Sequence, residues 1–140
     1  MYKKILVPLE NSPTDDAIVD HLRALAPHHG ATLLLVHVAD GFGARYQEGL
    51  NLADSEEMRK DAEYLEQRRS ELVCEGLGVE VRLEAGDPAT KLVEVAEREG
   101  CDLIAMATHR HGALQDLIRG TVASAVRHRT MIPVLMVPGR

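Results

Sequence analysis

Short apolar runs rich in valine, isoleucine and leucine alternate along this chain with longer segments whose apolar residues recur every three or four positions. The first pattern is typical of buried β-strands and the second of amphipathic α-helices. Because parallel strands need long crossover connections, such a series predicts a parallel sheet joined by helices. The predicted strands are Ile5–Val7, Thr32–Val38, Val79–Leu83, Leu103–Ala107 and Pro133–Val137.

Three of these runs are continuously apolar: Ile5–Val7, Leu33–Val36 and Leu103–Met106. Strands covered on both faces have such sequences, whereas strands with one face in solvent alternate between apolar and polar residues. We therefore predict a single α/β domain over residues 1–140, with a doubly wound, five-stranded parallel sheet and helices on both faces. Rossmann-like sheets of this kind bind ligands beyond the carboxyl ends of the strands, where the strand order reverses.

Capping and turn residues mark the ends of the predicted helices. Thr14 is expected to act in capping the first helix, and Asp87 followed by Pro88 is a typical helix start. The predicted helices extend from Asn11–Thr14 to Gly30, from Asp54 or Ser55 to Gly76, from Asp87 to Gly100 and from about Ala113 to Arg127, with residues 39–53 as one long irregular stretch.

Composition excludes several classes of partner. The formal net charge of −6 argues against a general basic surface for nucleic acid or anionic lipid, and an aromatic content of 3% leaves few platforms for base stacking. We expect neither nucleic acid nor a membrane as a partner, and a cytoplasmic protein. The two cysteines, Cys74 and Cys101, lack the spacing of a disulfide framework or a zinc site, and we expect no metal site in the protein itself.

The segment Met106–Val122, with the sequence MATHRHGALQDLIRGTV, resembles the signature G-x-x-G-x9-G-[ST] of universal stress proteins. Four further segments are similar to that family: Lys3–Ser12, Val36–Val38, Ala85–Pro88 and Ile132–Val137. The resemblance covers the whole chain. It implies the fold of the adenine nucleotide alpha hydrolase-like group, which agrees with the Rossmann-like sheet predicted above.

In the ATP-binding branch of this family the signature wraps the ribose and phosphates of ATP. The resemblance therefore implies that the cofactor is ATP or another adenine nucleotide, with magnesium as an optional companion. Free backbone N–H groups where a loop enters a helix suit phosphate oxygens, which supports the same location. The implied binding residues are Pro8, Leu9, Glu10, Val38, Met106, Ala107, Thr108, His109, Arg110, His111, Gly112, Ala113, Gly120, Thr121 and Val122.

The chain departs from the family pattern at two signature glycines, which are replaced by Ala107 and Arg110. Glycine in such a loop permits unusual backbone angles or close approach to a ligand, and a side chain obstructs both. Gly112 is the candidate to take over the permissive role. Glu10 stands where many members carry aspartate for the ribose hydroxyls, and it offers a longer carboxylate of the same chemistry.

The function predicted from these features is a nucleotide-binding signalling or stress-response module without catalytic residues. His37 is expected to be a hydrogen-bonded core residue rather than a catalytic base. Two alternatives stay open: a slow ATPase, and a dimeric scaffold of the branch that does not bind ATP. The replaced glycines favour the scaffold, whereas phosphoryl transfer would need ion ligands and a charge clamp that the sequence does not display.

The terminal apolar run is the basis for a prediction of assembly. A strand that comes last in a βα series is expected at a sheet edge, where its unpaired backbone groups invite pairing with another chain. The family resemblance implies a homodimer through the same strand. The predicted interface residues are Pro133, Val134, Leu135, Met136 and Val137.

Overall fold

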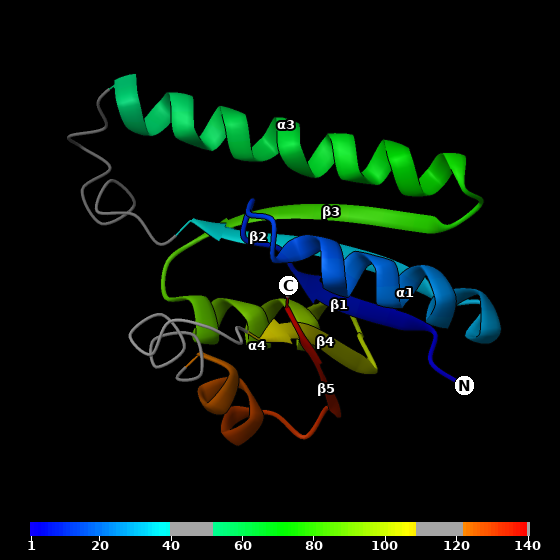
Figure 1. Cartoon of the computed structure of the whole chain (residues 1–140). Helices are drawn as coiled ribbons and strands as arrows, with labels where there is room; N and C mark the ends of the chain where they lie inside the picture. The colour runs from blue at the N-terminus through cyan, green and yellow to red at the C-terminus, as the bar shows by residue number, and fades with distance from the viewer. Residues whose placement is uncertain (40–51, 109–121, 140) are drawn as a thin grey trace.

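Five strands form one parallel sheet with helices packed on its two faces (Figure 1). The structure, a computed structural model, describes residues 1–39, 52–108 and 122–139. The predicted α/β architecture is therefore confirmed. Its elements are β1 (Lys4–Pro8), α1 (Asp15–His29), β2 (Thr32–Ala39), α3 (Leu52–Cys74), β3 (Gly78–Ala85), α4 (Pro88–Arg98), β4 (Leu103–Thr108) and β5 (Val134–Pro138), and residues 122–129 are also helical.

The strand order is β3-β2-β1-β4-β5, which makes the sheet doubly wound. The chain runs outward from β1 through β2 to β3, crosses back to β4 beside β1, and continues outward to β5. The order therefore reverses between β1 and β4, at the centre of the sheet. Both β3 and β5 are edge strands, as predicted for the terminal strand.

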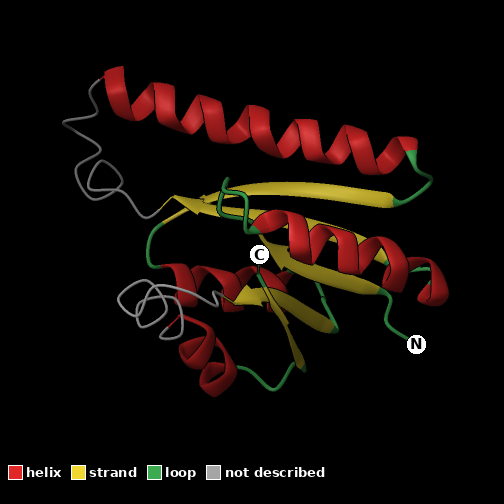
Figure 2. Ribbon diagram, viewed as in Figure 1, coloured by secondary structure: helices red, strands yellow, loops and turns green. Residues whose placement is uncertain are grey.

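Helices α1 and α3 cover one side of the sheet (Figure 2). Alternate residues of the strands pack against these helices. Ile5 and Val7 of β1 are fully buried there against Ile18 and Leu22 of α1, within a cluster that also includes Leu65 and Leu72 of α3. The apolar positions of α1 recur at helical spacing, so one face of the helix meets the sheet.

The intervening strand residues face α4 and the helical residues 122–129. Leu6, Leu34 and Ile104 are fully buried in this second cluster, where they pack with Val95 of α4 and Val126. Both faces of the central strands are thus covered, which is why these strands are continuously apolar in sequence.

Local sequence signals account for most helix ends. Gly30 ends α1 in the left-handed conformation, with φ of 61°, and Asp87 caps α4 by accepting a hydrogen bond from the Thr90 backbone N–H at 3.0 Å. The prediction for the start of the long helix, Asp54 or Ser55, lies two or three residues after the first residue of α3, Leu52. Leucine and alanine are strong helix formers, so the helix continues upstream of the expected caps.

Two further boundaries differ from prediction. The last helix ends at residue 129 rather than at Arg127, because no glycine or proline interrupts it there. Strand β5 begins at Val134 rather than at Pro133, which has no N–H to donate. The Pro133 carbonyl oxygen still accepts a hydrogen bond from the Ile104 N–H at 3.0 Å.

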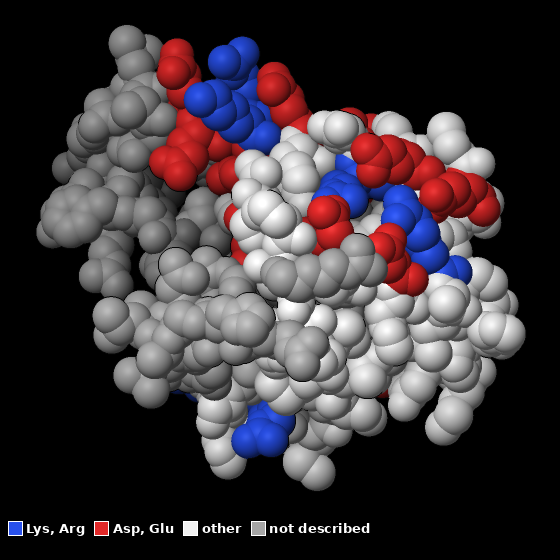
Figure 3. All heavy atoms as spheres, in the orientation of Figure 1, with Lys and Arg blue, Asp and Glu red and all other residues white. Residues whose placement is uncertain are grey.

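Charged side chains of both signs gather in the upper part of the face in Figure 3, where α1 and α3 lie. Helix α3 carries an exposed row of acidic and basic residues, including the pair Arg59 and Glu63 and the pair Glu66 and Arg69. Pairs of this kind at a spacing of three or four residues stabilise a helix only slightly, so this surface is a solvated helix face.

Candidate functional site

The sheet opens between the carboxyl ends of β1 and β4. Strand β1 pairs with β2 along its whole length, and beyond it the Leu9 N–H donates to the Val36 carbonyl oxygen at 2.8 Å. With β4, however, β1 pairs only at Ile5 and Leu6. The crevice therefore lies where the strand order reverses, the position at which doubly wound sheets bind ligands.

Pro8 contributes to this opening through its missing N–H. The Lys3 carbonyl oxygen accepts from β2, through the Thr32 N–H at 2.9 Å, and the Lys4 carbonyl oxygen accepts from the Asp102 N–H at 3.0 Å, on the β4 side. Because successive residues of a strand point their backbone groups to opposite neighbours, Pro8 faces β4 with no donor. The ladder between β1 and β4 is not continued at this position.

A pocket of about 290 Å³ occupies the crevice. This volume lies near the lower end of the range for small-molecule sites, which begins at about 300 Å³. Apolar side chains make up most of its described wall, and among the lining residues that the structure describes Glu10, Asp15 and His37 carry polar side chains. The described lining residues are Pro8, Leu9, Glu10, Asp15, Val36, His37, Val38, Pro88, Leu92, Met106, Ala107 and Val122.

Most of the described residues that the sequence singled out lie together in this pocket. They come from the end of β1, the end of β2, the end of β4 and the described helical residues 122–129. Thr108 is not among the lining residues, and its carbonyl oxygen accepts a hydrogen bond from the Gly139 N–H at 2.5 Å. Of the remaining predicted residues, His109, Arg110, His111, Gly112, Ala113, Gly120 and Thr121 lie outside the described residues.

Five of the described lining residues were not singled out from the sequence as ligand contacts: Asp15, Val36, His37, Pro88 and Leu92. Pro88 and Leu92 lie on the first turns of α4, which begins just after the carboxyl end of β3. A signal for both was available, since a helix that follows a strand starts on the ligand-binding edge of the sheet. Val36 carries no comparable signal, because it is the last residue of the continuously apolar run Leu33–Val36 and resembles its neighbours there.

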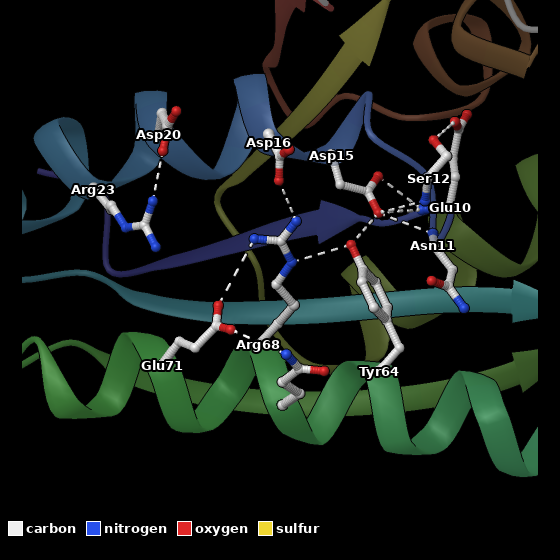
Figure 4. Close-up of polar contacts among 11 residues, drawn as sticks. Glu10, Asn11, Ser12, Asp15, Asp16, Asp20, Arg23, Tyr64, Arg68 and Glu71 are labelled. Carbon is white, nitrogen blue, oxygen red and sulfur yellow. Dashed lines mark hydrogen bonds and ion pairs between the residues drawn. The ribbon is translucent and has the colours of Figure 1, made fainter.

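The carboxylate of Asp15 organises the loop that follows β1. It is 1% exposed and accepts hydrogen bonds from the backbone N–H groups of Glu10 at 2.9 Å and Asn11 at 2.9 Å, with a longer contact to Ser12 at 3.4 Å (Figure 4). The expectation that Thr14 caps α1 is wrong, because its side chain makes no capping hydrogen bond. The carboxylate of Asp15, one residue later, accepts the hydrogen bonds of the loop N–H groups instead.

This arrangement determines which ligand groups suit the loop. A run of backbone N–H groups ahead of a helix is an anion site in many α/β proteins. Here Asp15 already supplies the anion, at distances of 2.9 to 3.4 Å. A ligand phosphate at residues 10–12 would displace a buried carboxylate, so the β1 side of the pocket favours uncharged or hydrogen-bond-donating groups.

Tyr64 of α3 completes the set of donors around Asp15. Its hydroxyl donates to Asp15 Oδ2 at 2.5 Å and accepts from Arg68 Nε at 3.1 Å. Burial and the hydrogen bond to Asp15 raise the pKa of Tyr64 well above its ordinary range. Although burial alone would lower it, hydrogen bonds to Asp16 and Tyr64 raise the pKa of Arg68. The tyrosine therefore stays a neutral donor, and the guanidinium stays charged.

His37 ties the end of β2 to its neighbours. Its Nδ1 lies 2.8 Å from the Leu9 carbonyl oxygen, and its Nε2 lies 3.2 Å from Asp61 Oδ2 on α3. Since both ring nitrogens face acceptors within the protein, neither is directed at a ligand as a proton acceptor. The expectation of a hydrogen-bonded residue is confirmed. Asp61 also accepts from Asn11 Nδ2 at 3.2 Å, which adds a second link from α3 to the loop.

The described part of the pocket wall carries negative charge. Glu10 and Asp15 are its ionisable acids, and no lysine or arginine occurs among the lining residues that the structure describes. Ser12 Oγ donates to Glu10 Oε2 at 3.2 Å, and a carboxylate has about four acceptor positions, so Glu10 can also accept from ligand hydroxyls.

Comparison with known proteins places the chain among others of the same size. The family model described as the universal stress protein family matches residues 1–138. A universal stress protein of Thermus aquaticus is 32% identical over 98% of this chain and 99% of its own length. One from Methanocaldococcus jannaschii is 27% identical over 98% of this chain and 95% of its own.

Solved structures give the same result. That of the Methanocaldococcus jannaschii protein covers 100% of this chain and 98% of its own, with a TM-score of 0.83 and 28% identity. The universal stress protein of Archaeoglobus fulgidus in complex with dAMP covers 97% and 98%, with a TM-score of 0.72 and 20% identity, and so shares the fold. On the family match over residues 1–138, the chain belongs to the universal stress protein family.

Proposed function

We propose that this universal stress protein binds an adenine nucleotide in the pocket between β1 and β4 and acts as a nucleotide-responsive module rather than as an enzyme. The observation that carries the proposal is the composition of that pocket. Residues that the family resemblance implies as nucleotide contacts, among them Pro8, Glu10, Val38 and Met106, line one cavity at the switch point of the sheet. The relative from Archaeoglobus fulgidus, solved with dAMP, supports the same ligand class.

The apolar walls suit the flat faces of a purine. Val36, Val38 and Leu92 contribute aliphatic surface from β2 and α4, and Met106 adds a polarisable thioether from β4. With a volume of about 290 Å³, the pocket is suited to the nucleoside part of a nucleotide rather than to the whole of ATP.

The polar groups suggest an orientation. The Glu10 carboxylate accepts hydrogen bonds and repels anions, so we expect it to receive the ribose hydroxyls. With the loop N–H groups of residues 10–12 occupied by Asp15, the phosphates are expected to point away from that loop. The family resemblance implies phosphate contacts in the segment from His109 to Thr121, which lies outside the described residues.

Magnesium is expected to enter, if at all, with the phosphates of ATP, because Mg²⁺ takes only one or two protein ligands and keeps several waters. Within residues 1–39, 52–108 and 122–139, no group of three or more histidine, cysteine or acidic side chains is arranged to hold a metal ion. We therefore propose a complex in which the ligand itself would bring the ion.

The proposal includes a homodimer through β5. The two sheet edges differ: β3 carries Glu80, Arg82 and Glu84 along eight residues, whereas the predicted interface of β5 is apolar. Charges along an edge strand discourage pairing with another chain, and their absence invites it. Antiparallel pairing of β5 across a two-fold axis would satisfy the open backbone groups of both copies.

We place the protein in the cytoplasm, as its sequence predicts. Within the described ranges, no helix combines the length and the apolar character needed to cross a membrane. A module of this kind would transmit the presence of a nucleotide through its dimer surface to other proteins, with the identity of the stress signal set by those partners.

Two measurements test the nucleotide proposal. Mass spectrometry of the purified protein, extracted under denaturing conditions, should detect an adenine nucleotide, and calorimetry should show binding of adenosine and of ATP. Replacing Glu10 by glutamine should weaken adenosine binding about tenfold, because a hydrogen bond to a carboxylate exceeds a neutral one by about 1–1.5 kcal/mol.

Glu63→Gln is the matched control for Glu10→Gln, since Glu63 is an exposed carboxylate on α3 that pairs with Arg59 and does not line the pocket. It should leave adenosine affinity unchanged. A protein that neither carries a nucleotide nor binds adenosine or ATP would contradict the proposal and favour a dimeric scaffold that does not bind ATP.

A further inference from the structure

Helix α3 reaches the ligand site through one face. Asp61, Tyr64 and Arg68 are spaced three and four residues apart, so they lie on the same side of the helix. Each contacts the segment that follows β1 or the start of α1. Asp61 accepts a hydrogen bond from Asn11. Tyr64 binds Asp15 and Arg68 binds Asp16 (Figure 4). The spacing and the neighbouring targets make these contacts one polar seam between α3 and residues 11–16, which include part of the site loop, residues 9–12, and the start of α1.

Tyr64 is the central contact of this seam. Its ring stands between α3 and α1, and its hydroxyl points directly at the Asp15 carboxylate (Figure 4). Arg68 holds the hydroxyl from the other side, through Nε and through its position 5.4 Å from the tyrosine ring centroid. The Tyr64 hydroxyl thus accepts a hydrogen bond from Arg68 and donates one to Asp15. The two bonds together give the ring a defined orientation.

Asp15 transmits this constraint to the loop. The same Oδ2 that accepts from Tyr64 also accepts from the backbone N–H groups of Asn11 and Ser12, and the Glu10 backbone N–H donates to both carboxylate oxygens. Asn11 has φ of 63°, a left-handed conformation that residues other than glycine rarely adopt. Such a conformation persists only where its surroundings enforce it.

We infer that Tyr64 is a positioning residue of the ligand site: by orienting Asp15, it holds the backbone of residues 10–12 and so the direction in which the Glu10 carboxylate faces the ligand. The inference rests on the proposed function of the same pocket and adds to it a residue on α3, outside the pocket lining. It also implies that a displacement of α3 would shift Asp15 and residues 10–12 and so change the affinity for the ligand.

Replacing Tyr64 by phenylalanine removes the donor to Asp15 and the acceptor for Arg68 while it preserves the ring. The N–H groups of residues 10–12 then hold a carboxylate that is free to reorient. We expect their amide hydrogen exchange to become about fivefold to tenfold faster, and adenosine binding to weaken by a similar factor, as for the loss of one hydrogen bond. Adenine has no ribose for Glu10 to bind and should lose little affinity.

Arg23→Gln is the matched control. Arg23 Nε donates to Glu75 Oε2 at 2.9 Å, so this variant also removes a polar link between α1 and the region of α3, but far from the site loop. Hydrogen exchange measured by NMR on both variants and the wild type, combined with NMR titrations of adenosine and adenine and with melting temperatures, separates loop positioning from general destabilisation. Arg23→Gln should leave both the exchange rates of residues 10–12 and adenosine affinity unchanged.

Three results would overturn the inference: unchanged exchange at residues 10–12 in Tyr64→Phe, equal acceleration in Arg23→Gln, or equal losses of affinity for adenosine and adenine. A wild-type protein that binds neither ligand would refute the proposed nucleotide function instead. The exchange rates would still decide whether Tyr64 positions the loop, so the two failures are distinguishable.

Discussion

Met136 provides the sharpest test of assembly through β5. It lies on the edge strand with 39% of its surface exposed, whereas its neighbour Leu135 packs into the core cluster shared with α1. The two side chains therefore face opposite sides of the sheet, as expected for a strand. A charge at Met136 tests the dimer without entering the core, which a charge at Leu135 would disrupt.

The expected effect of Met136→Lys follows from this exposure. Complete burial of methionine is worth about 1.5–3 kcal/mol, so burying the exposed two-fifths in a dimer contributes about 0.6–1.2 kcal/mol per copy. Because a two-fold axis relates the copies, each copy carries the substitution and the loss occurs twice. The axis also brings two lysines near each other, at a further cost of about 1 kcal/mol. The total of about 2–3.5 kcal/mol predicts a dimer dissociation constant about 30- to 300-fold higher.

Sedimentation velocity measures this shift in the dissociation constant at protein concentrations of about 1 to 100 μM, which bracket typical dimer affinities. Val73→Lys is the control, because Val73 is similarly exposed, at 43%, but lies on α3. Circular dichroism should show that both variants stay folded. The reasoning is refuted if the wild type is monomeric throughout this range, or if Met136→Lys and Val73→Lys dimerise equally well.

Two other predictions concern single titratable groups. Burial alone would raise the pKa of Asp102, but hydrogen bonds from the Lys3 and Lys4 N–H groups lower it below its ordinary value. This stabilisation exists above the unfolded pKa of about 3.9 and is lost as pH falls through the lower folded pKa, so Asp102→Asn should cost about 1 kcal/mol at pH 7 and progressively less in acid. Urea unfolding of the wild type and of Asp102→Asn, measured at pH 7 and again in acid, checks this prediction. A difference in the free energy of unfolding that did not change with pH would contradict it. Burial raises the pKa of Cys101 to about 11, so at pH 8 its thiolate fraction is about 0.1% and native protein should be alkylated by iodoacetamide at the exposed Cys74 alone. Peptide mapping that finds rapid native modification of Cys101 would show that its burial is wrongly assigned.

The sequence by itself determined the class of fold and the region of the site. Continuously apolar strands, helical spacing between them, and stop signals such as Gly30 and the Asp87–Pro88 pair are local patterns, and each follows from the conformations of a few neighbouring residues. The rule for doubly wound sheets then predicted a ligand crevice beyond the carboxyl ends of the strands, where the strand order reverses, and the structure has this reversal between β1 and β4. The family resemblance supplied the identity of most described pocket residues from the same local motifs.

The interactions that shape the site were decided by tertiary structure. Asp15 resembles an ordinary acidic residue at a helix start, and its role depends on Tyr64, which follows it by 49 residues. The link between His37 and Asp61 likewise joins two elements whose relative position no local pattern specifies. Hydrogen bonds of buried polar groups depend on how helices pack over a sheet, because burial makes each missing partner costly and packing determines which partner is within reach.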